Sequence, residues 1–212
     1  MRTIIGLDFS LNKPACCVLS NNIYYFISWP LMLQDNLLTT YERSGVNIIN
    51  RENKREKSDN LSDRLRNEIS DSMELSKLIT DTLKQYFIEH AVISIEGPSF
   101  SSAGNISYQI SGYRYILMRE LLNFVSLDHI YTYAPITIKS IAMASKRDQG
   151  KSEMIDSFIK MAPNCRLFES LNSDPNRFKK RGGNSWVTLL DDLIDSFWCI
   201  ETLRYKEPNL FS

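Results

Sequence analysis

The sequence predicts an α/β fold built around a mixed β-sheet. Three short apolar segments come first in the chain, and only the turn-like stretches LNKP and NN separate them. Beyond them, short strand-like segments alternate with segments of helical periodicity, and a long amphipathic helix comes last. Adjacent strands followed by alternating helices and strands are typical of an α/β arrangement around one sheet.

The first three segments are expected to form an antiparallel meander. TIIGLDF, PACCVLS and NIYYFISW begin at residue 3 and end near Trp29, and all three are rich in residues that favour strands. From about residue 30 to residue 60 this pattern is lost, because the stretch is polar and mixed in charge. We expect a long loop or a polar insertion there.

The remainder of the chain is expected to alternate between helices and strands within a single domain that spans residues 1–212. The expected elements are a helix from Leu61 to Glu89, a strand at 91–96, a helix from Ile106 to Val125, a strand at 129–135, short helices over ITIKSIAMA and SEMIDSFIKMA, a loop-like stretch at 163–183, and a last helix over SWVTLLDDLIDSFWCIETLR. Ser185 is the expected N-cap of that last helix.

Composition places the chain among folded proteins of the cell interior. No apolar run approaches the roughly 20 residues of a membrane-spanning helix, and no signal peptide opens the chain, so we expect a cytoplasmic protein with no membrane partner. The four cysteines form no CxxC pair, which argues against a zinc site. Formal net charge is zero, with 25 basic and 25 acidic residues, so overall charge does not favour nucleic acid.

Acidic residues stand at three unusual points of the chain. Asp8 lies inside the first strand, where a charge is costly unless it is paired or bound to metal. Glu96 ends the strand VISIE, at the edge where such sheets commonly carry functional groups. Asp192 and Asp195 are three residues apart and share one helix face, whereas Asp191 points about 100° away from Asp192 and is left outside the site. Each residue alone is more often a capping or surface carboxylate, but the combination predicts a common site.

Such a group of carboxylates is expected to bind metal. Two like charges 4 Å apart cost roughly 4 kcal/mol at an effective dielectric constant of 20, so an empty cluster would take up protons. Carboxylates are the hard oxygen ligands that Mg²⁺ prefers. Two Mg²⁺ ions about 4 Å apart can activate water and neutralise a phosphodiester during its hydrolysis.

These motifs resemble those of the RuvC-type Holliday junction resolvases, which belong to the RNase H-like superfamily. The resemblance rests on GLDFS with PA shortly after it, on IEGPSFSSAGN, on the run ITIKSIAMASKRDQGKSEMI before a helix, and on the late DxxD. It covers most of the chain outside residues 30 to 60 and is closest to the shorter, phage-type RuvC-like proteins. It implies an RNase H-like sheet with flanking helices, and a phage or virus origin.

The resemblance also implies an activity and its participants. The chain would be a crossover junction endodeoxyribonuclease that resolves four-way or branched DNA by paired phosphodiester hydrolysis. Asp8, Glu96, Asp192 and Asp195 would be its catalytic residues and would bind two Mg²⁺ ions, which Mn²⁺ could replace. A homodimer would present two active sites to a symmetric junction. The helix from Ile106 to Val125, with Tyr108, Tyr113 and Tyr115, could supply the dimer face, although these tyrosines are equally consistent with core packing.

Basic and aromatic residues are then expected to contact DNA. The clusters KRDQGK and RFKKR could flank a cleft, although each alone is equally consistent with solvated surface. Lys146 and Lys151 both remain candidates for the basic residue nearest the site, and Phe100 could stack on a base. The expected DNA-binding residues are Phe100, Lys139, Lys146, Arg147, Lys151, Arg177, Lys179, Lys180 and Arg181.

Three other functions fit parts of the pattern. The same acidic residues would serve an RNase H-like nuclease acting on RNA–DNA hybrids, flaps or replication intermediates. GLDFS is also similar to the first phosphate loop of actin-like ATPases, but the chain has only eight glycines and no Walker motif. A DNA-binding protein without catalysis is the third, and the complete set of acidic residues argues against it.

Overall fold

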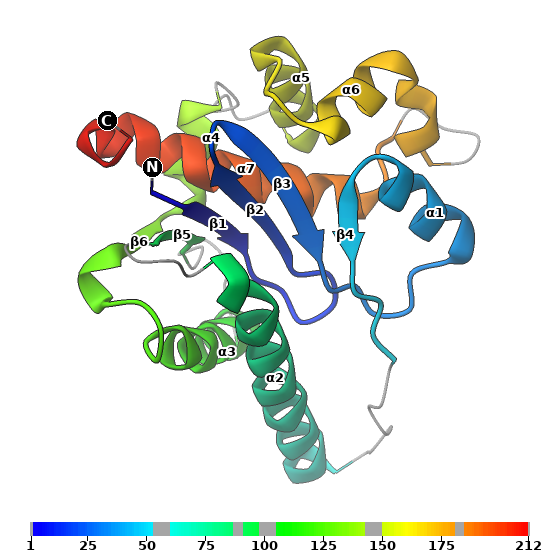
Figure 1. The fold of residues 1–212 in the computed structure, drawn as a ribbon. Helices are drawn as coiled ribbons and strands as arrows, with labels where there is room; N and C mark the ends of the chain where they lie inside the picture. Colours follow the sequence, from blue (N-terminus) through cyan, green and yellow to red (C-terminus); the bar gives the residue numbers. More distant parts are fainter. Residues whose placement is uncertain are drawn as a thin grey trace.

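The computed structural model describes residues 2–52, 60–86, 91–97, 105–142, 150–180 and 185–211. A six-stranded sheet in the order β4-β3-β2-β1-β5-β6 forms the centre of this part of the chain (Figure 1). Its strands are β1 (Ile4–Asp8), β2 (Ala15–Ser20), β3 (Ile23–Ser28), β4 (Val46–Ile48), β5 (Val92–Glu96) and β6 (Ile130–Tyr133). The first three strands form an antiparallel meander, while β5 pairs with β1, β6 with β5 and β4 with β3 in parallel. The predicted mixed sheet is therefore confirmed.

Helices cover both faces of the sheet. They are α1 (Asp35–Arg43), α2 (Leu61–Leu83), α3 (Asn105–Leu121), α4 (Pro135–Ile141), α5 (Lys151–Met161), α6 (Arg166–Ser173) and α7 (Thr188–Lys206), with short 3₁₀ helices at Lys84–Tyr86, Leu127–His129, Pro175–Phe178 and Pro208–Leu210. Helix α7 crosses one face, and α2 and α3 lie on the other, with the amino-terminal half of α2 extending away from the sheet (Figure 1). No helix of the described residues is long and apolar enough to span a membrane.

Strand β1 sends alternate side chains into two separate hydrophobic clusters. Ile5 and Leu7 pack with residues of α2 and α3, whereas Ile4 packs with residues of α7. Because side chains alternate along a strand, Gly6 and Asp8 face α7 together with Ile4. This alternation places the first-strand carboxylate under the last helix.

Gly6 and Ser94 let α7 lie very close to the sheet. A Cβ atom added at Gly6 would lie 2.0 Å from the backbone oxygen of Ser196, so no larger side chain fits there. On the neighbouring strand, the buried Ser94 hydroxyl donates a hydrogen bond of 2.8 Å to the carbonyl oxygen of Cys199. The first turns of α7 are therefore held directly above the carboxyl ends of β1 and β5.

The long loop expected from about 30 to 60 is wrong in part, because this stretch contains α1 and β4. Tyr41 of α1 is completely buried and packs against Phe178, with ring centroids 5.6 Å apart. Strand β4 extends the sheet by pairing with β3. Helix α1 and strand β4 are thus stabilised by the burial of a few apolar side chains, although the stretch that contains them is mostly polar and gave no sign of them.

Two further predictions near the end of the chain need correction. The loop-like stretch at 163–183 contains α6, whose Leu167 and Leu171 are buried one helical turn apart. Ser185 is not the N-cap of the last helix, because α7 begins at Thr188 after Val187, and no side chain caps it. Packing of Leu167 and Leu171 overrides the local turn preference in α6. Before α7, Ser185 and Val187 instead form backbone hydrogen bonds with Lys180 and Phe178, which delays the start of the helix.

Helix α3 bears on the expected dimer face. Tyr113 is buried, whereas Tyr115 is 70% exposed. The side chain of Tyr108 lies outside the described residues. One of these tyrosines is therefore core, and another is free to contact a partner.

Candidate functional site

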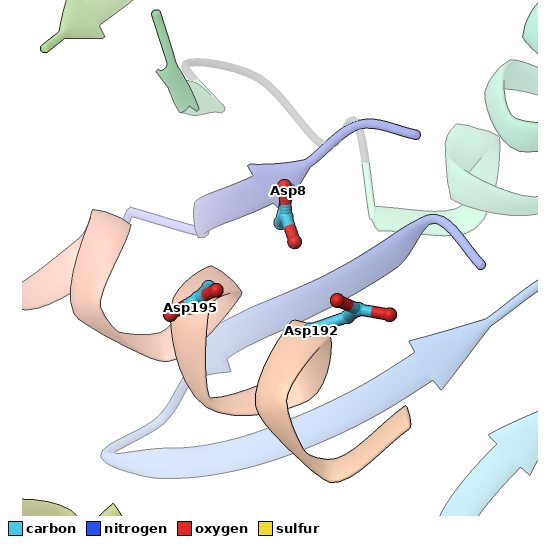
Figure 2. A group of neighbouring side chains, drawn as sticks. All are labelled: Asp8, Asp192 and Asp195. Carbon is cyan, nitrogen blue, oxygen red and sulfur yellow. The ribbon is translucent and has the colours of Figure 1, made fainter. Parts of the chain in front are cut away.

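Three carboxylates predicted from the sequence lie together at the carboxyl end of β1. Asp8, Asp192 and Asp195 each offer an oxygen atom, and these oxygens all lie within 4.8 Å of one another (Figure 2). We refer to these three residues as the carboxylate cluster. Asp8 projects from β1, while Asp192 and Asp195 project from successive turns of α7 towards it (Figure 2). The cluster thus joins residues from opposite ends of the described chain.

Glu96 stands next to Asp8. Strands β1 and β5 run parallel with Leu7 opposite Ile95, so the residues that follow these two are neighbours. Glu96 lies close enough to Asp8 for its charge and a side-chain contact to raise the pKa of Asp8. All four acidic residues predicted for the site are therefore brought to one end of the sheet.

Burial and mutual repulsion raise the pKa of each of the three carboxyl groups in the carboxylate cluster. The pKa of Asp8 is raised well above its ordinary value by burial and then by the charges of Glu96, Asp195 and Asp192. Burial likewise raises the pKa of Asp192 and of Asp195 to about 7, against the opposing effect of Lys151. Such a group of acids gains from any cation that replaces its protons.

Lys151 supplies one such cation. As the first residue of α5, it places its Nζ atom 3.7 Å from Asp191 and from Asp192, and 3.9 Å from Asp195. Burial alone would lower its pKa, but the three carboxylates raise it overall. Of the two lysines that the sequence left open, Lys151 therefore lies at the site, and Lys146 lies outside the described residues.

Asp191, which the sequence analysis left outside the site, is not part of the carboxylate cluster. It is nevertheless buried and shares Lys151 with Asp192 and Asp195. Burial raises its pKa, while Lys151, Lys180 and Lys13 act to lower it. Its place in the first turn of α7 also favours a negative charge.

A cleft of about 550 Å³ opens beside the carboxylate cluster. Asp192, Lys151 and Thr188 form one side, the loop after β1 with Lys13 forms another, and α2 and α3 contribute Glu68, Tyr113 and Arg114. Lys13 donates a hydrogen bond from Nζ to the Thr188 hydroxyl.

The sequence analysis did not predict Lys13 or Arg114 as residues of the site. The signal for Lys13 was its position in the turn that immediately follows Asp8.

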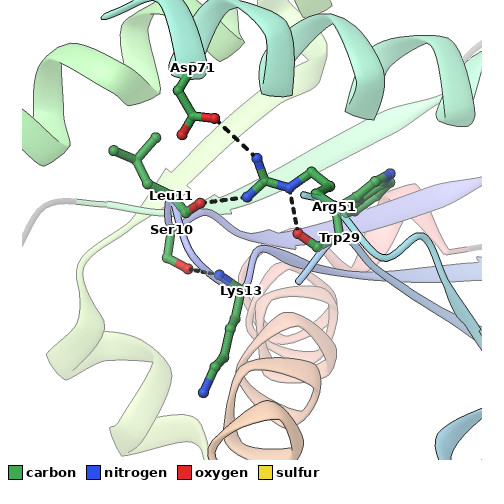
Figure 3. Close-up of polar contacts among 6 residues, drawn as sticks. All are labelled: Ser10, Leu11, Lys13, Trp29, Arg51 and Asp71. Atoms are coloured by element: carbon green, nitrogen blue, oxygen red, sulfur yellow. Dashed lines mark hydrogen bonds and ion pairs between the residues drawn. The ribbon is translucent and has the colours of Figure 1, made fainter. Parts of the chain in front are cut away.

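Arg51 fixes the loop that carries Lys13. Its guanidinium donates to the carbonyl oxygens of Leu11 and Trp29, at 2.6 and 2.8 Å, and lies 3.5 Å from Asp71 of α2 (Figure 3). The Lys13 backbone N–H also donates to the Ser10 hydroxyl (Figure 3). One wall of the cleft is thus held in place by a largely buried arginine from the segment expected to be a loop.

The other predicted DNA-binding residues fall into three groups. Lys180 lies close enough to influence Asp191, and Lys179 stacks over the Trp186 ring at 5.4 Å. Arg177 pairs with Asp174 in its own turn at 2.8 Å, and no contact within the described ranges joins Lys139 on α4 to the carboxylate cluster. Phe100, Lys146, Arg147 and Arg181 lie outside the described residues.

The fold is an RNase H-like α/β fold. Two solved structures of RuvC from Thermus thermophilus resemble it, each with a TM-score of 0.51. The first is 10% identical and matches 96% of this chain and 96% of its own. The second, a complex of that RuvC with a Holliday junction substrate, is 7% identical and matches 98% of this chain and 97% of its own. Neither a family model nor a curated protein matches the sequence.

The arrangement suits chemistry on a phosphodiester. Clustered carboxylates of raised pKa offer hard oxygen ligands to a divalent cation. The adjoining cleft carries Lys13, Arg114 and Lys151, whose positive charges favour an anionic ligand. Divalent-metal chemistry and anion binding therefore have their residues side by side.

Proposed function

We propose that this chain is a divalent-metal-dependent endonuclease that resolves four-way DNA junctions by paired phosphodiester hydrolysis. The observation that carries the proposal is the convergence of Asp8, Asp192 and Asp195, with Glu96 beside them, at the edge of an RNase H-like sheet. The structural likeness extends over nearly the whole chain and includes a RuvC that was solved with a Holliday junction substrate.

The residues present fit a pair of Mg²⁺ ions, or Mn²⁺ in their place. Asp8, Glu96, Asp192 and Asp195 offer only carboxylate oxygens, the donor type that both ions accept. Bound there, the ions would supply a water activated for attack and neutralise charge on the phosphate. The carboxylate cluster would hold and orient the ions, and Lys151 would then be free to bind a phosphate oxygen instead of the carboxylates.

The cations around the cleft serve DNA binding in this proposal. Lys13, Lys151 and Lys180 lie close to the carboxylates and contact the backbone near the cleavage point. Lys179, Arg177 and Lys139 would contact the arms further away, and the same role is proposed for Phe100, Lys146, Arg147 and Arg181, which lie outside the described residues. Phosphate contacts of this kind position the substrate without reading its sequence.

A homodimer completes the proposal. A four-way junction has approximate two-fold symmetry, so a two-fold dimer places one active site on each of two equivalent strands. The exposed Tyr115 of α3 belongs to the face proposed for this contact. We place the activity in the cytoplasm of a host cell, as that of a phage- or virus-encoded protein.

Cleavage of synthetic substrates tests the proposal. A labelled four-way junction, a duplex, a flap and an RNA–DNA hybrid are incubated with Mg²⁺ and either the wild-type chain or Asp8→Asn. We expect symmetric nicks in the junction, and their rate should fall by more than about a hundredfold in Asp8→Asn, because loss of an outer-shell partner alone costs up to that much. Removal of metal with EDTA should abolish cleavage.

Asp128→Asn is the matched control. Asp128 is exposed in the 3₁₀ helix that precedes β6, at the amino end of the parallel strands β1, β5 and β6, whereas the carboxylate cluster lies at the carboxyl end of β1. The Asp128→Asn chain should cleave the junction at the wild-type rate. Faster cleavage of the hybrid or the flap would show that the junction is not the preferred substrate, while the proposed metal site would still stand. Cleavage that survives loss of both Asp192 and Asp195 would refute the site itself.

A further inference from the structure

The wall of the cleft formed by α3 carries a cation that the carboxylates do not use. Arg114 lines the cleft together with Lys13 and Lys151. Lys151 is shared by Asp191, Asp192 and Asp195, and Lys13 is bonded to Thr188. Arg114 differs from both in its bonding.

Two nitrogen atoms of Arg114 are buried without a hydrogen-bond partner. Its Nε and Nη1 atoms have negligible exposure and reach no acceptor in the described part of the chain. A buried guanidinium whose N–H groups bond neither protein nor water is costly. Proteins rarely keep such a group unless something else supplies the acceptors.

The neighbouring carboxylate does not supply them. Glu68, on the same wall of the cleft, accepts a hydrogen bond from the Tyr113 hydroxyl. No ion pair joins Glu68 to Arg114 among the residues that the structure describes. The acceptors for these two nitrogen atoms therefore lie outside these residues, and Arg114 borders the cleft into which a ligand could bring them.

We propose that Arg114 is a phosphate-binding residue of the cleft, which takes the oxygens of a DNA phosphate next to the one that is cut. The Nε–H and Nη1–H groups point to different sides of the planar guanidinium, so each needs its own acceptor, and the oxygens of a phosphate are strong acceptors for arginine N–H groups. Asp192 on the facing wall would repel a phosphate, so the cation on α3 also sets which side of the cleft the backbone follows. This inference rests on the proposed nuclease function and assigns to it a residue that the sequence motifs did not indicate.

The proposal has a consequence for stability that separates it from a structural role. Replacing an arginine that has two buried, unpartnered nitrogen atoms with an apolar side chain of similar length removes the desolvation cost of those atoms. Arg114→Met should therefore have a melting temperature equal to or above that of the parent. A structural arginine that holds α3 to α2 would instead lower the melting temperature when it is replaced.

Junction binding tests the proposal directly. Affinity for a labelled four-way junction is measured by fluorescence anisotropy across a range of salt concentrations in an Asp8→Asn background, which blocks cleavage. Arg114→Met should weaken binding by about tenfold to a hundredfold, the loss expected for a hydrogen bond to a charged group. The slope of log K against log salt should fall by about 0.9, as for one lost phosphate contact.

Two further variants serve as controls. Arg119→Met removes the same charge from an exposed position of the same helix and should change affinity by less than about twofold. Arg114→Lys keeps the charge but loses the planar set of N–H donors, so its affinity should lie between those of the parent and Arg114→Met. Equal affinities for Arg114→Met and Arg119→Met, or a lowered melting temperature with unchanged affinity, would overturn the proposal.

Failure of the nuclease proposal would be distinguishable from failure of this one. If the wild-type chain neither binds nor cuts DNA, inorganic phosphate is titrated while the Nε–H resonance of Arg114 is followed by NMR, with Arg114→Met used for assignment. A saturable shift of this resonance would support phosphate binding by Arg114 even though the nuclease proposal had failed. An unmoved resonance at saturating phosphate rejects the anion site.

Discussion

Gly6 sets the distance between β1 and α7, and through it the position of Asp8 beneath Asp192 and Asp195. The backbone oxygen of Ser196 and side-chain atoms of Ile200 and Cys199 occupy the space where a side chain would lie. Ser94 on the adjacent strand fixes the same helix by a hydrogen bond. Two small residues thus control the geometry of carboxylates that lie elsewhere in the sequence.

Gly6→Ala should be strongly destabilising. A Cβ atom only 2.0 Å from a backbone oxygen forces α7 away from the sheet, and overpacking of this kind costs about 3 kcal/mol of unfolding free energy, the upper end of the usual range. Urea unfolding monitored by circular dichroism measures the loss. Gly112→Ala is the control, since nothing lies within 4 Å of a Cβ there, and alanine should stabilise helix α3 by about 1 kcal/mol. Equal stabilities for the two variants would contradict the close packing.

Lys151 shows how a single side chain can hold a site together in the absence of metal. Its ammonium group lies within 4 Å of Asp191, Asp192 and Asp195, which would otherwise repel one another. About half of the lysine side chain remains exposed, so it can swing out of the site without disturbing the core. A divalent cation can therefore replace it at low structural cost.

The segment between β3 and α2 is tied to the cleft by Arg51. Its guanidinium connects the loop after β1, the end of β3 and helix α2 through Leu11, Trp29 and Asp71. The arginine side chain is only 10% exposed, so its hydrogen bonds are poorly replaced by water. These three elements should consequently loosen together if the arginine is lost.

Arg51→Met should cost about 3 kcal/mol of unfolding free energy, because it leaves the carbonyl oxygens of Leu11 and Trp29 without their donor. Hydrogen exchange should speed up in residues 9–13, and junction cleavage should slow because Lys13 loses its position. Arg66→Met is the control, since Arg66 forms an exposed ion pair with Asp63 and should change stability by less than about 0.5 kcal/mol. Unchanged exchange in the loop would show that Arg51 does not hold it.

Elements with a clear apolar period were predictable from the sequence, and those stabilised by a few buried residues were not. The three strands of the meander, β5, β6, α2, α3 and α7 lie where the periodicity indicated, with shifted ends. Helix α1 depends on the burial of Tyr41, and α6 on Leu167 and Leu171, within otherwise polar stretches. Because their stability comes from contacts with distant parts of the chain, local sequence carried little signal for them.

The same division applies to the candidate site. Asp8, Glu96 and the pair on α7 stood out because a charge inside an apolar element needs a reason. Lys13 and Arg114 lie in polar or amphipathic surroundings where cations are common, so only the fold shows that they share a cleft with Asp192. The sequence thus indicated which acids matter more readily than which cations accompany them.

The stability of the whole molecule should depend on pH through the carboxylate cluster. Asp192 and Asp195 have pKa values near 7 in the folded chain and an ordinary value of 3.8. Between these values the folded state binds more protons than the unfolded state, so the unfolding free energy falls as pH rises, and the loss is complete above the folded pKa. Without divalent metal, the melting temperature should therefore decrease from about pH 5 to about pH 8.

Mg²⁺ should reverse this trend, because it binds the ionised carboxylates that become available at higher pH. Thermal shift assays should show a larger gain in melting temperature with Mg²⁺ at about pH 8 than at about pH 5. In the double variant Asp192→Asn with Asp195→Asn, both the pH dependence and the Mg²⁺ effect should shrink. A Mg²⁺ effect that is equal at both pH values, or that persists in the double variant, would contradict a metal site at these residues.

The carboxylate cluster joins β1, the first of the described strands to be synthesised, to α7, the last long helix of the described chain. A growing chain can pair β1 with β2 and β3 early, because these strands are neighbours in sequence. Asp192 and Asp195 reach Asp8 only after α7 has been synthesised and has docked over Gly6. Translation itself therefore delays the proposed nuclease activity, and a chain truncated before α7 should release no active enzyme onto the DNA of the cell that makes it.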